Sequence, residues 1–316
     1  MSHPHGPAET GPPTLRGVDE HTFVDGYGVE VFTRRWPVDD PAGVVVLAHG
    51  ASEHSGRYDR FARALNGASF AAVALDHRGH GRTGPSLQRG TMGPGAGRAV
   101  LDDLHELRTT ATAAAGADVP VFVFAHSMGS LIALAYLTEH PEGLAGAVLC
   151  GFPSDVDGVA ALREVMQAAT DAGLRDEPVA TFTGYNEAFE PARTPFDWLS
   201  RDEAEVDRYI ADPMCGDGNP LTYGYLIDLF DVVAPAREHL DAITFPVLVI
   251  GGDRDSSGAM GAHPKALAAA LATAAVPVDL TLYEGARHEL LNETNRDEVT
   301  ADVVAWLTRT GAGPEH

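Results

Sequence analysis

The feature that most constrains the fold of this sequence is a series of short apolar runs separated by longer stretches of helical periodicity. The runs have apolar residues on both faces, which is typical of strands buried in a parallel sheet between helices. They occupy 43–48, 70–75, 119–125, 145–150, 247–250 and 278–282. An antiparallel leading strand is expected at 30–36, and helices at 58–65, 130–138, 264–273 and 296–307. This alternation predicts an α/β fold with a mostly parallel, doubly wound sheet.

The alternation stops between residues 152 and 242, where helical patterns and many aromatic residues replace the strand-like runs. Because the sheet resumes after this stretch, we interpret 152–242 as a helical cap inserted into the fold. The predicted core is then 17–151 together with 243–311. Residues 1–16 are rich in Pro, Gly and His, without an apolar segment, and are predicted to be a disordered tail.

A serine lies where a predicted strand passes through a tight turn into a helix. The sequence is Val121-Phe-Val-Phe-Ala-His-Ser127-Met-Gly-Ser130. This pattern is typical of a nucleophile held at an exposed, strained turn, and it differs from G-x-S-x-G only in having Ala125 at the first glycine. The alternative interpretation is that Ser127 merely caps the helix.

A His-Gly turn follows the first long buried strand, at His49-Gly50-Ala51. Acyl transfer requires two backbone N–H donors aimed at the developing oxyanion. We expect one from Met128, the residue after the serine, and the other from Ala51 in this turn. The alternative is an ordinary glycine turn at the end of a strand.

Two later loops contain an acid and a histidine, each after its own strand. Asp253 and Asp255 follow the strand at 247–250, and His288 follows the strand at 278–282. The order Ser, Asp, His along the chain is that of α/β hydrolases. It predicts a triad of Ser127, Asp255 and His288, with Asp255 preferred over Asp253 because its G-x-x-D spacing lets the loop turn towards the histidine.

Four segments together resemble the monoacylglycerol lipase and bacterial lysophospholipase family: His49–Tyr58, Asp76–Thr83, Ala125–Ser130 and Arg287–Glu293. Phe196–Asp202, in the predicted cap, resembles the bacterial branch. The resemblance covers roughly Thr22–Leu307. It implies hydrolysis of a single acyl ester beneath a helical cap, with no metal or organic cofactor. The chain departs from the pattern in two places. Ala125 replaces the first glycine of the serine motif, and Ser256-Ser257 follow the acid, where the bacterial branch often has Pro-Val.

The expected substrate is therefore a small acyl ester, either a monoacylglycerol or a lysophospholipid. Aromatic residues of the cap are candidates for an acyl tunnel or for packing alone: Phe182, Tyr185, Phe189, Phe196, Trp198, Tyr223, Tyr225 and Phe230. The alternatives are a short-chain or aryl carboxylesterase, and a catalytically silent binding protein on a hydrolase scaffold. Metallohydrolase chemistry is disfavoured because no H-E-x-x-H spacing occurs.

The formal net charge of −23 argues against binding to nucleic acid, whose phosphates require a basic surface. Cys150 and Cys215 form no C-x-x-C motif, which favours a reducing compartment. With neither an apolar run of about 18 residues nor a signal-peptide pattern, the sequence predicts a cytoplasmic protein without a transmembrane segment. It leaves open a peripheral membrane contact through the cap.

Overall fold

The computed structural model describes residues 17–84, 87–154, 158–179 and 184–312. The predicted tail at 1–16 and the aromatic Phe182 lie outside these residues. The described chain forms an eight-stranded sheet of order β1-β2-β4-β3-β5-β6-β7-β8. Its strands are β1 (Asp19–Val24), β2 (Glu30–Trp36), β3 (Gly43–Ala48), β4 (Phe70–Leu75), β5 (Val121–His126), β6 (Leu144–Cys150), β7 (Val247–Gly252) and β8 (Val278–Tyr283).

The sheet is parallel from β4 to β8, while β1 and β2 are antiparallel additions at one edge. The central strands β3, β5 and β7 are buried along their whole length. Parallel strands end at the same edge of a sheet, so the loops that follow β3, β5, β7 and β8 gather at one edge. The predicted doubly wound α/β fold is confirmed.

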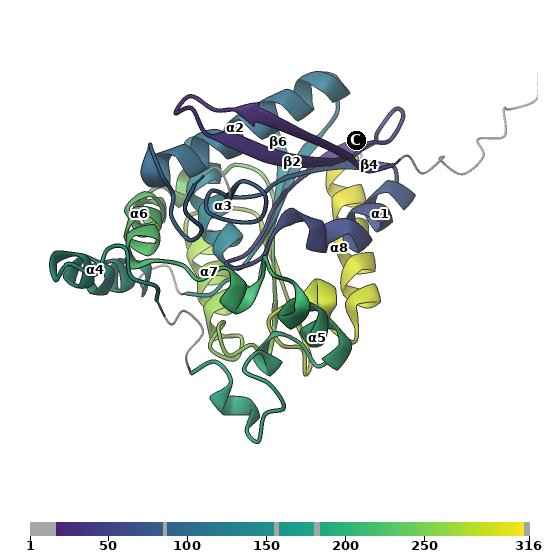
Figure 1. The fold of residues 1–316 in the computed structure, drawn as a ribbon. Coiled ribbons are helices and arrows are strands. Elements are labelled where there is room, and N and C mark those ends of the chain that lie inside the picture. The colour runs from purple at the N-terminus through teal and green to yellow at the C-terminus, as the bar shows by residue number, and fades with distance from the viewer. Residues whose placement is uncertain (1–16, 85–86, 155–157, 180–183, 313–316) are drawn as a thin grey trace, which may run out of the picture.

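Helices cover both faces of the sheet (Figure 1). One face packs against α1 (Asp59–Gly67) and α8 (Arg296–Gly311), through Phe61 and Trp306 among others. The other packs against α2 (Ala96–Ala115), α3 (Met128–Glu139) and α7 (Ala262–Thr273). No helix within the described ranges is long and apolar enough to cross a membrane.

The sequence pattern does not predict two of these elements. Strand β1 contains Asp19, Glu20 and His21, and almost all of it is exposed, so it has no apolar pattern to reveal it. Helix α2 also escapes prediction. Strand β8 differs from the expectation of burial on both faces, because it is the other edge of the sheet and leaves Leu280 41% exposed.

The segment between β6 and β7 contains helices joined by irregular stretches in its described parts. It contributes α4 (Gly158–Asp171), α5 (Glu203–Ala211), α6 (Tyr223–Val233) and several short 3-10 helices. Helix α6 packs against α2, α3 and α4 and shares the main apolar core through Tyr225 and Phe230. The aromatic residues Phe196, Trp198 and Tyr209 belong to a separate, smaller apolar cluster. The predicted cap boundaries, 152 and 242, stay a prediction.

Candidate active site

Ser127 occupies the sharp turn between β5 and α3. Its backbone has φ 52° and ψ −121°, a region that residues other than glycine rarely adopt. The turn is possible because Gly129 lets α3 approach the end of β3. A Cβ at Gly129 would lie 2.3 Å from the carbonyl oxygen of Ala48 and 2.5 Å from that of His49. At the other glycine position of the motif, Ala125 fits within the fully buried end of β5.

A chain of two hydrogen bonds links the three residues of the predicted triad. His288 Nε2 lies 2.9 Å from Ser127 Oγ, and His288 Nδ1 lies 2.9 Å from Asp255 Oδ2. Asp255 is fully buried and His288 is only 2% exposed, whereas Ser127 is half-buried. Burial by itself raises the pKa of the Asp255 carboxyl, but the charge and hydrogen bond of His288 outweigh it and hold that pKa below its usual value. The carboxylate is therefore ionised where it meets the imidazole.

The neighbouring Asp253 makes a different contact. Its Oδ1 accepts a hydrogen bond of 2.7 Å from the backbone N–H of Gly285, in the turn after β8. Asp253 thus joins the loop after β7 to the loop after β8, while Asp255 reaches the histidine. Asp255 lies two residues further along the chain than Asp253, which gives the loop room to turn back towards His288.

Ala51 and Met128 are the residues whose backbone N–H groups are predicted to act as oxyanion donors. Both residues line the same cleft as Ser127. Among the described residues, neither N–H donates a hydrogen bond to another group of the chain. Two free amides next to the serine can therefore donate to an oxygen that enters the cleft.

The cleft in front of Ser127 encloses about 580 Å³, including space open to solvent. Leu131 comes from α3, and most of the remaining wall comes from the predicted cap. The other lining residues are Pro153, Ser154, Leu162, Tyr185, Trp198, Leu221, Leu226, Leu229, Phe230 and Ser257. A concave, largely apolar wall with a few polar groups is the usual form of a small-molecule site.

The sequence analysis named eight aromatic residues of the cap as candidates for an acyl tunnel. Three of them, Tyr185, Trp198 and Phe230, line the cleft. Phe196 instead packs against Tyr209, with ring centroids 5.2 Å apart. Trp198 also lies against the histidine of the triad, as the two ring centroids of Trp198 and His288 are 4.9 Å apart.

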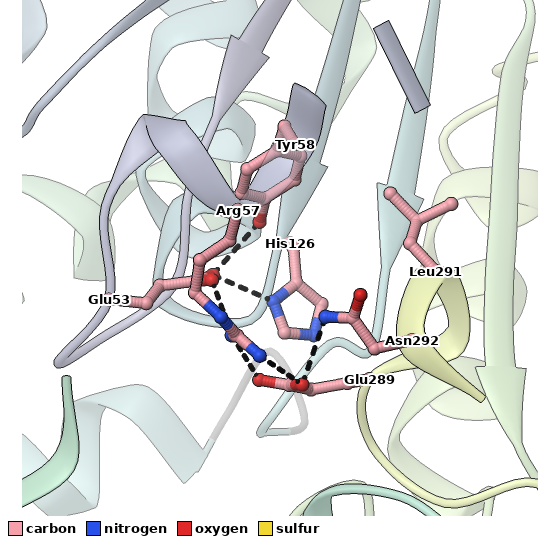
Figure 2. A pocket seen from close by; sticks show the side chains of 7 residues that line it. All are labelled: Glu53, Arg57, Tyr58, His126, Glu289, Leu291 and Asn292. Atoms are coloured by element: carbon pink, nitrogen blue, oxygen red, sulfur yellow. Dashed lines mark hydrogen bonds and ion pairs between the residues drawn. The ribbon is translucent and has the colours of Figure 1, made fainter. Parts of the chain in front are cut away.

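A second, small cavity is lined mostly by polar side chains, including those of Glu53, Arg57 and Glu289, to which sequence reasoning gave no role (Figure 2). Arg57 joins two buried carboxylates, donating to Glu53 at 2.8 Å and to Glu289 at 2.5 and 2.7 Å. Asn292 donates to Glu289 at 3.0 Å. The signal available in the sequence was the pair Glu53 and Arg57, four residues apart directly after a buried strand.

Other histidines near the site have structural contacts. His77 and His80 are at most 1% exposed. His54, Asp212 and Cys215 form the one group within the described ranges whose side chains are close enough to share a metal ion. Both ring nitrogens of His54 are already engaged, however. Nδ1 accepts from the N–H of Gly56 at 3.1 Å, so Nε2 carries the proton and donates to Asp212 at 2.9 Å.

Comparison with known proteins identifies the family. Residues 39–295 match the family model described as "Serine aminopeptidase, S33". The chain is 33% identical over 298 residues to a monoacylglycerol lipase of Mycolicibacterium smegmatis, covering 91% of this chain and 96% of that protein. It is 30% identical over 303 residues to human monoglyceride lipase, covering 92% and 90%.

Solved structures agree with this relationship. A thermostable carboxyl esterase from Bacillus coagulans in complex with glycerol superposes with a TM-score of 0.85 at 28% identity, covering 94% of this chain and 99% of that one. A lipase in its open form gives a TM-score of 0.84 at 30% identity, covering 93% and 99%. The chain therefore belongs to the monoacylglycerol lipase family of the α/β hydrolases and is a hydrolase of the lipase and esterase type.

Proposed function

We propose that this protein hydrolyses carboxylic esters through an acyl-serine intermediate, with Ser127 as nucleophile, His288 as general base and Asp255 as the supporting acid. The observation that carries the proposal is the chain of hydrogen bonds from Asp255 through His288 to Ser127 Oγ, which ends in an apolar cleft. A hydroxyl bonded to a histidine that a carboxylate orients is the usual form of an activated serine.

The proposed reaction has two halves. Ser127 Oγ attacks the ester carbonyl carbon while His288 Nε2 takes its proton, and the N–H groups of Ala51 and Met128 stabilise the oxyanion. The bond to the alcohol then breaks as His288 gives the alcohol oxygen that proton. In the second half a water molecule attacks the acyl-serine with the same histidine as base, and releases the carboxylic acid and free Ser127.

The substrate we propose is a monoacyl lipid, either a monoacylglycerol or a lysophospholipid. The leucines and aromatic residues that surround Ser127 support binding of an alkyl chain, since burial of each CH₂ contributes about 0.8 kcal/mol. The names of the bacterial and human relatives, monoacylglycerol lipase and monoglyceride lipase, point to the same class.

A short-chain or aryl carboxylesterase is the second candidate. It is favoured by the likeness to the Bacillus coagulans carboxyl esterase. A series of p-nitrophenyl esters from acetate to palmitate, together with monoacylglycerols of the same chain lengths, separates the two. A kcat/KM that rises to medium or long chains supports the lipid substrate. A maximum at acetate or butyrate supports the esterase.

The acyl-serine step has its own test. A fluorophosphonate should label the protein at one site per chain, and Ser127→Ala should remove both the label and the hydrolysis. Loss of this nucleophile is expected to lower turnover by roughly 10⁶-fold. Stoichiometric labelling that persists in Ser127→Ala would contradict the assignment of the nucleophile.

The cap also has features suited to a peripheral membrane contact. Helix α4 lies at the outer edge of the molecule (Figure 1) and leaves Leu162 41% and Val165 59% exposed. Leu162 also lines the cleft, so the apolar surface is continuous with the site. In the proposed function, α4 contacts the lipid surface from which the substrate enters. Val165→Glu should then lower hydrolysis of lipid in vesicles and leave hydrolysis of a water-soluble ester unchanged.

A further inference from the structure

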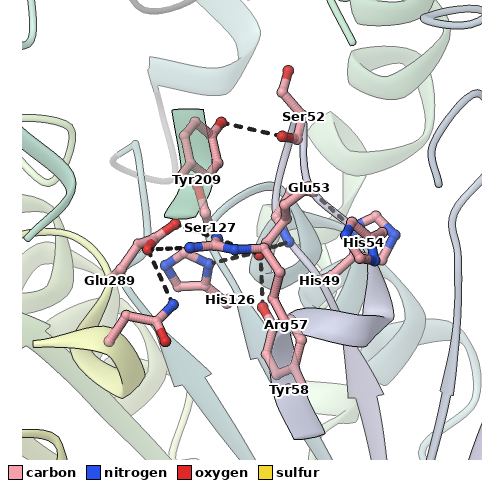
Figure 3. A network of polar contacts seen from close by, with 12 residues as sticks. His49, Ser52, Glu53, His54, Arg57, Tyr58, His126, Ser127, Tyr209 and Glu289 are labelled. Carbon is pink, nitrogen blue, oxygen red and sulfur yellow. Dashed lines mark hydrogen bonds and ion pairs between the residues drawn. The ribbon is translucent and has the colours of Figure 1, made fainter. Parts of the chain in front are cut away.

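Glu53 lies at the centre of a buried polar network next to the proposed oxyanion site (Figure 3). Its Oε1 accepts hydrogen bonds from the backbone N–H of Gly50 at 2.6 Å and from the Tyr58 hydroxyl at 2.9 Å. The same oxygen lies 3.3 Å from His126 Nδ1, and Oε2 accepts from Arg57 at 2.8 Å. A side chain that is only 3% exposed thus has three hydrogen-bond donors and the ring of His126 around it.

The charge state of this network follows from its contacts. Burial raises the pKa of the Glu53 carboxyl, but the hydrogen bond with His126 and the charge of Arg57 outweigh burial and hold that pKa well below its usual value. Glu53 is therefore a carboxylate, and its bond to the N–H of Gly50 is charge-assisted, about twice as strong as a neutral one. It fixes the peptide unit between His49 and Gly50.

His49 holds the next peptide unit. Its ring Nε2 accepts from the backbone N–H of His77 at 2.8 Å, so the ring proton is on Nδ1, which donates to the carbonyl oxygen of Gly50 at 2.8 Å. In a trans peptide the C=O and the following N–H point in opposite directions. A hydrogen bond that fixes the Gly50 carbonyl therefore also fixes the direction of the Ala51 N–H.

The two contacts leave little freedom in this turn. Glu53 holds one peptide unit by its N–H, and His49 holds the next by its C=O. Gly50 itself lacks a side chain that could limit its φ and ψ, and a Cβ there would lie 2.9 Å from Glu53 Oε1. Without the two hydrogen bonds, the glycine would be free to rotate the plane that carries the Ala51 N–H.

We infer that Glu53 and His49 are positioning residues, which hold two successive peptide units and so aim the Ala51 N–H at the developing oxyanion. This inference rests on the proposed function, because it assigns a purpose to a donor used in acyl transfer. Preorganised donors of this kind act without reorganisation as the charge forms, and loss of one typically costs about 10² to 10³ in kcat. Misdirection of a donor that is still present should cost less.

The test compares an ester with the matching thionoester, which has sulfur in place of the carbonyl oxygen. Sulfur is a weak hydrogen-bond acceptor, so the preference for the ester measures how well the oxyanion donors are aligned. In Glu53→Gln the amide has one acceptor oxygen where the carboxylate has two, and cannot serve both Gly50 and Arg57. We expect kcat for the ester to fall about 10- to 100-fold, KM to change less than about threefold, and the ester preference to fall with kcat.

Asp76→Asn is the matched control. Asp76 is a carboxylate 1% exposed, and it accepts from the N–H groups of Ser55 and Arg82 at 2.8 Å each, without touching Gly50. Its loss should lower stability and leave the ester preference unchanged. If Glu53→Gln does not fold, His49→Phe is the independent variant, since it keeps an aromatic ring and removes the donor to Gly50, together with the acceptor for the N–H of His77. It should lower the ester preference in the same way.

The outcomes separate the inference from the function on which it rests. An equal loss on ester and thionoester in Glu53→Gln and in His49→Phe would reduce both residues to structural supports and overturn the inference. Wild-type protein that hydrolyses no ester and takes no fluorophosphonate label would overturn the proposed function instead. Wild-type protein that hydrolyses the ester and the thionoester equally well would show that Ala51 is not an oxyanion donor. That result would also overturn the inference.

Discussion

The indole ring of Trp198 lies against the imidazole of His288, with ring centroids 4.9 Å apart and an angle of 39° between the planes. Trp198 is 2% exposed and comes from the predicted cap, whereas His288 follows the last strand of the sheet. In the proposed mechanism His288 becomes a cation during the attack. The face of an indole attracts a nearby cation by about 0.5–2 kcal/mol, the upper end applying where water is excluded.

Replacing Trp198 should therefore slow the chemical step. We expect Trp198→Leu to lower kcat for a short aryl ester by about tenfold, because the cation loses its aromatic neighbour. Trp198→Phe should stay within about threefold of the parent. The stoichiometry of fluorophosphonate labelling serves as the check on folding. If the Leu and Phe variants are equally active, the ring contributes packing alone.

The two acids after β7 should differ sharply in their effect on turnover. Asp255→Asn removes the charge that supports the imidazolium, and should lower kcat by about 10⁴. Asp253→Asn keeps an oxygen that can accept from Gly285 and should stay within about tenfold of the parent. The free energy of unfolding of both variants is measured as well, because their kcat values can be compared only if both are about as stable as the parent. A larger loss from Asp253→Asn would mean that the acid has been misassigned.

The sheet and the loops at its carboxyl edge could be predicted because each depends on local signals. Buried strands such as β3 and β5 are continuous apolar runs, and the order of Ser127, Asp255 and His288 follows the order of the strands. Edge strand β1 could not be predicted, since its stability comes from pairing with β2 and not from an apolar pattern of its own.

The network around Glu53 escaped prediction for a related reason. Its contacts join residues far apart in the chain, as in the ion pair between Arg57 and Glu289. A glutamate in a loop after a strand is usually a solvated surface residue. These side chains become a buried network because the histidine loop and Tyr209 of the predicted cap pack against the Glu53 loop.

Preference for acyl chain length should respond to the wall of the Ser127 cleft. Phe230→Trp adds volume at a lining position, and we expect it to shift the optimum to shorter chains while turnover of an acetate ester changes little. Phe196→Leu is the control, since Phe196 belongs to the cap but packs against Tyr209 and does not line the cleft. A p-nitrophenyl ester series measures both. Equal shifts of the optimum chain length in the two variants would mean that the cap affects chain-length preference through its stability and not through contacts with the acyl chain.

Acid should destabilise the fold through its buried histidines. Burial, followed by the nearby His49, lowers the pKa of His80 to about 3, and burial likewise lowers the pKa values of His49 and His77. A histidine in the unfolded chain titrates near about 6.5. The unfolded state therefore takes up the proton first. The stability that comes from keeping His80 neutral is complete above about pH 6.5 and declines as the pH falls towards 3, by about 2 kcal/mol at pH 5.

Urea unfolding of His80→Phe at pH 7.5 and pH 5 tests this. The variant should be less stable than the parent at pH 7.5, because it loses the hydrogen bond between His80 Nδ1 and the carbonyl of Arg78. The stability lost between the two pH values should nevertheless be smaller in the variant, by about 2 kcal/mol. Contributions of titrating groups that do not interact with His80 cancel in this difference. A parallel loss in parent and His80→Phe would show that His80 does not resist protonation in the folded protein.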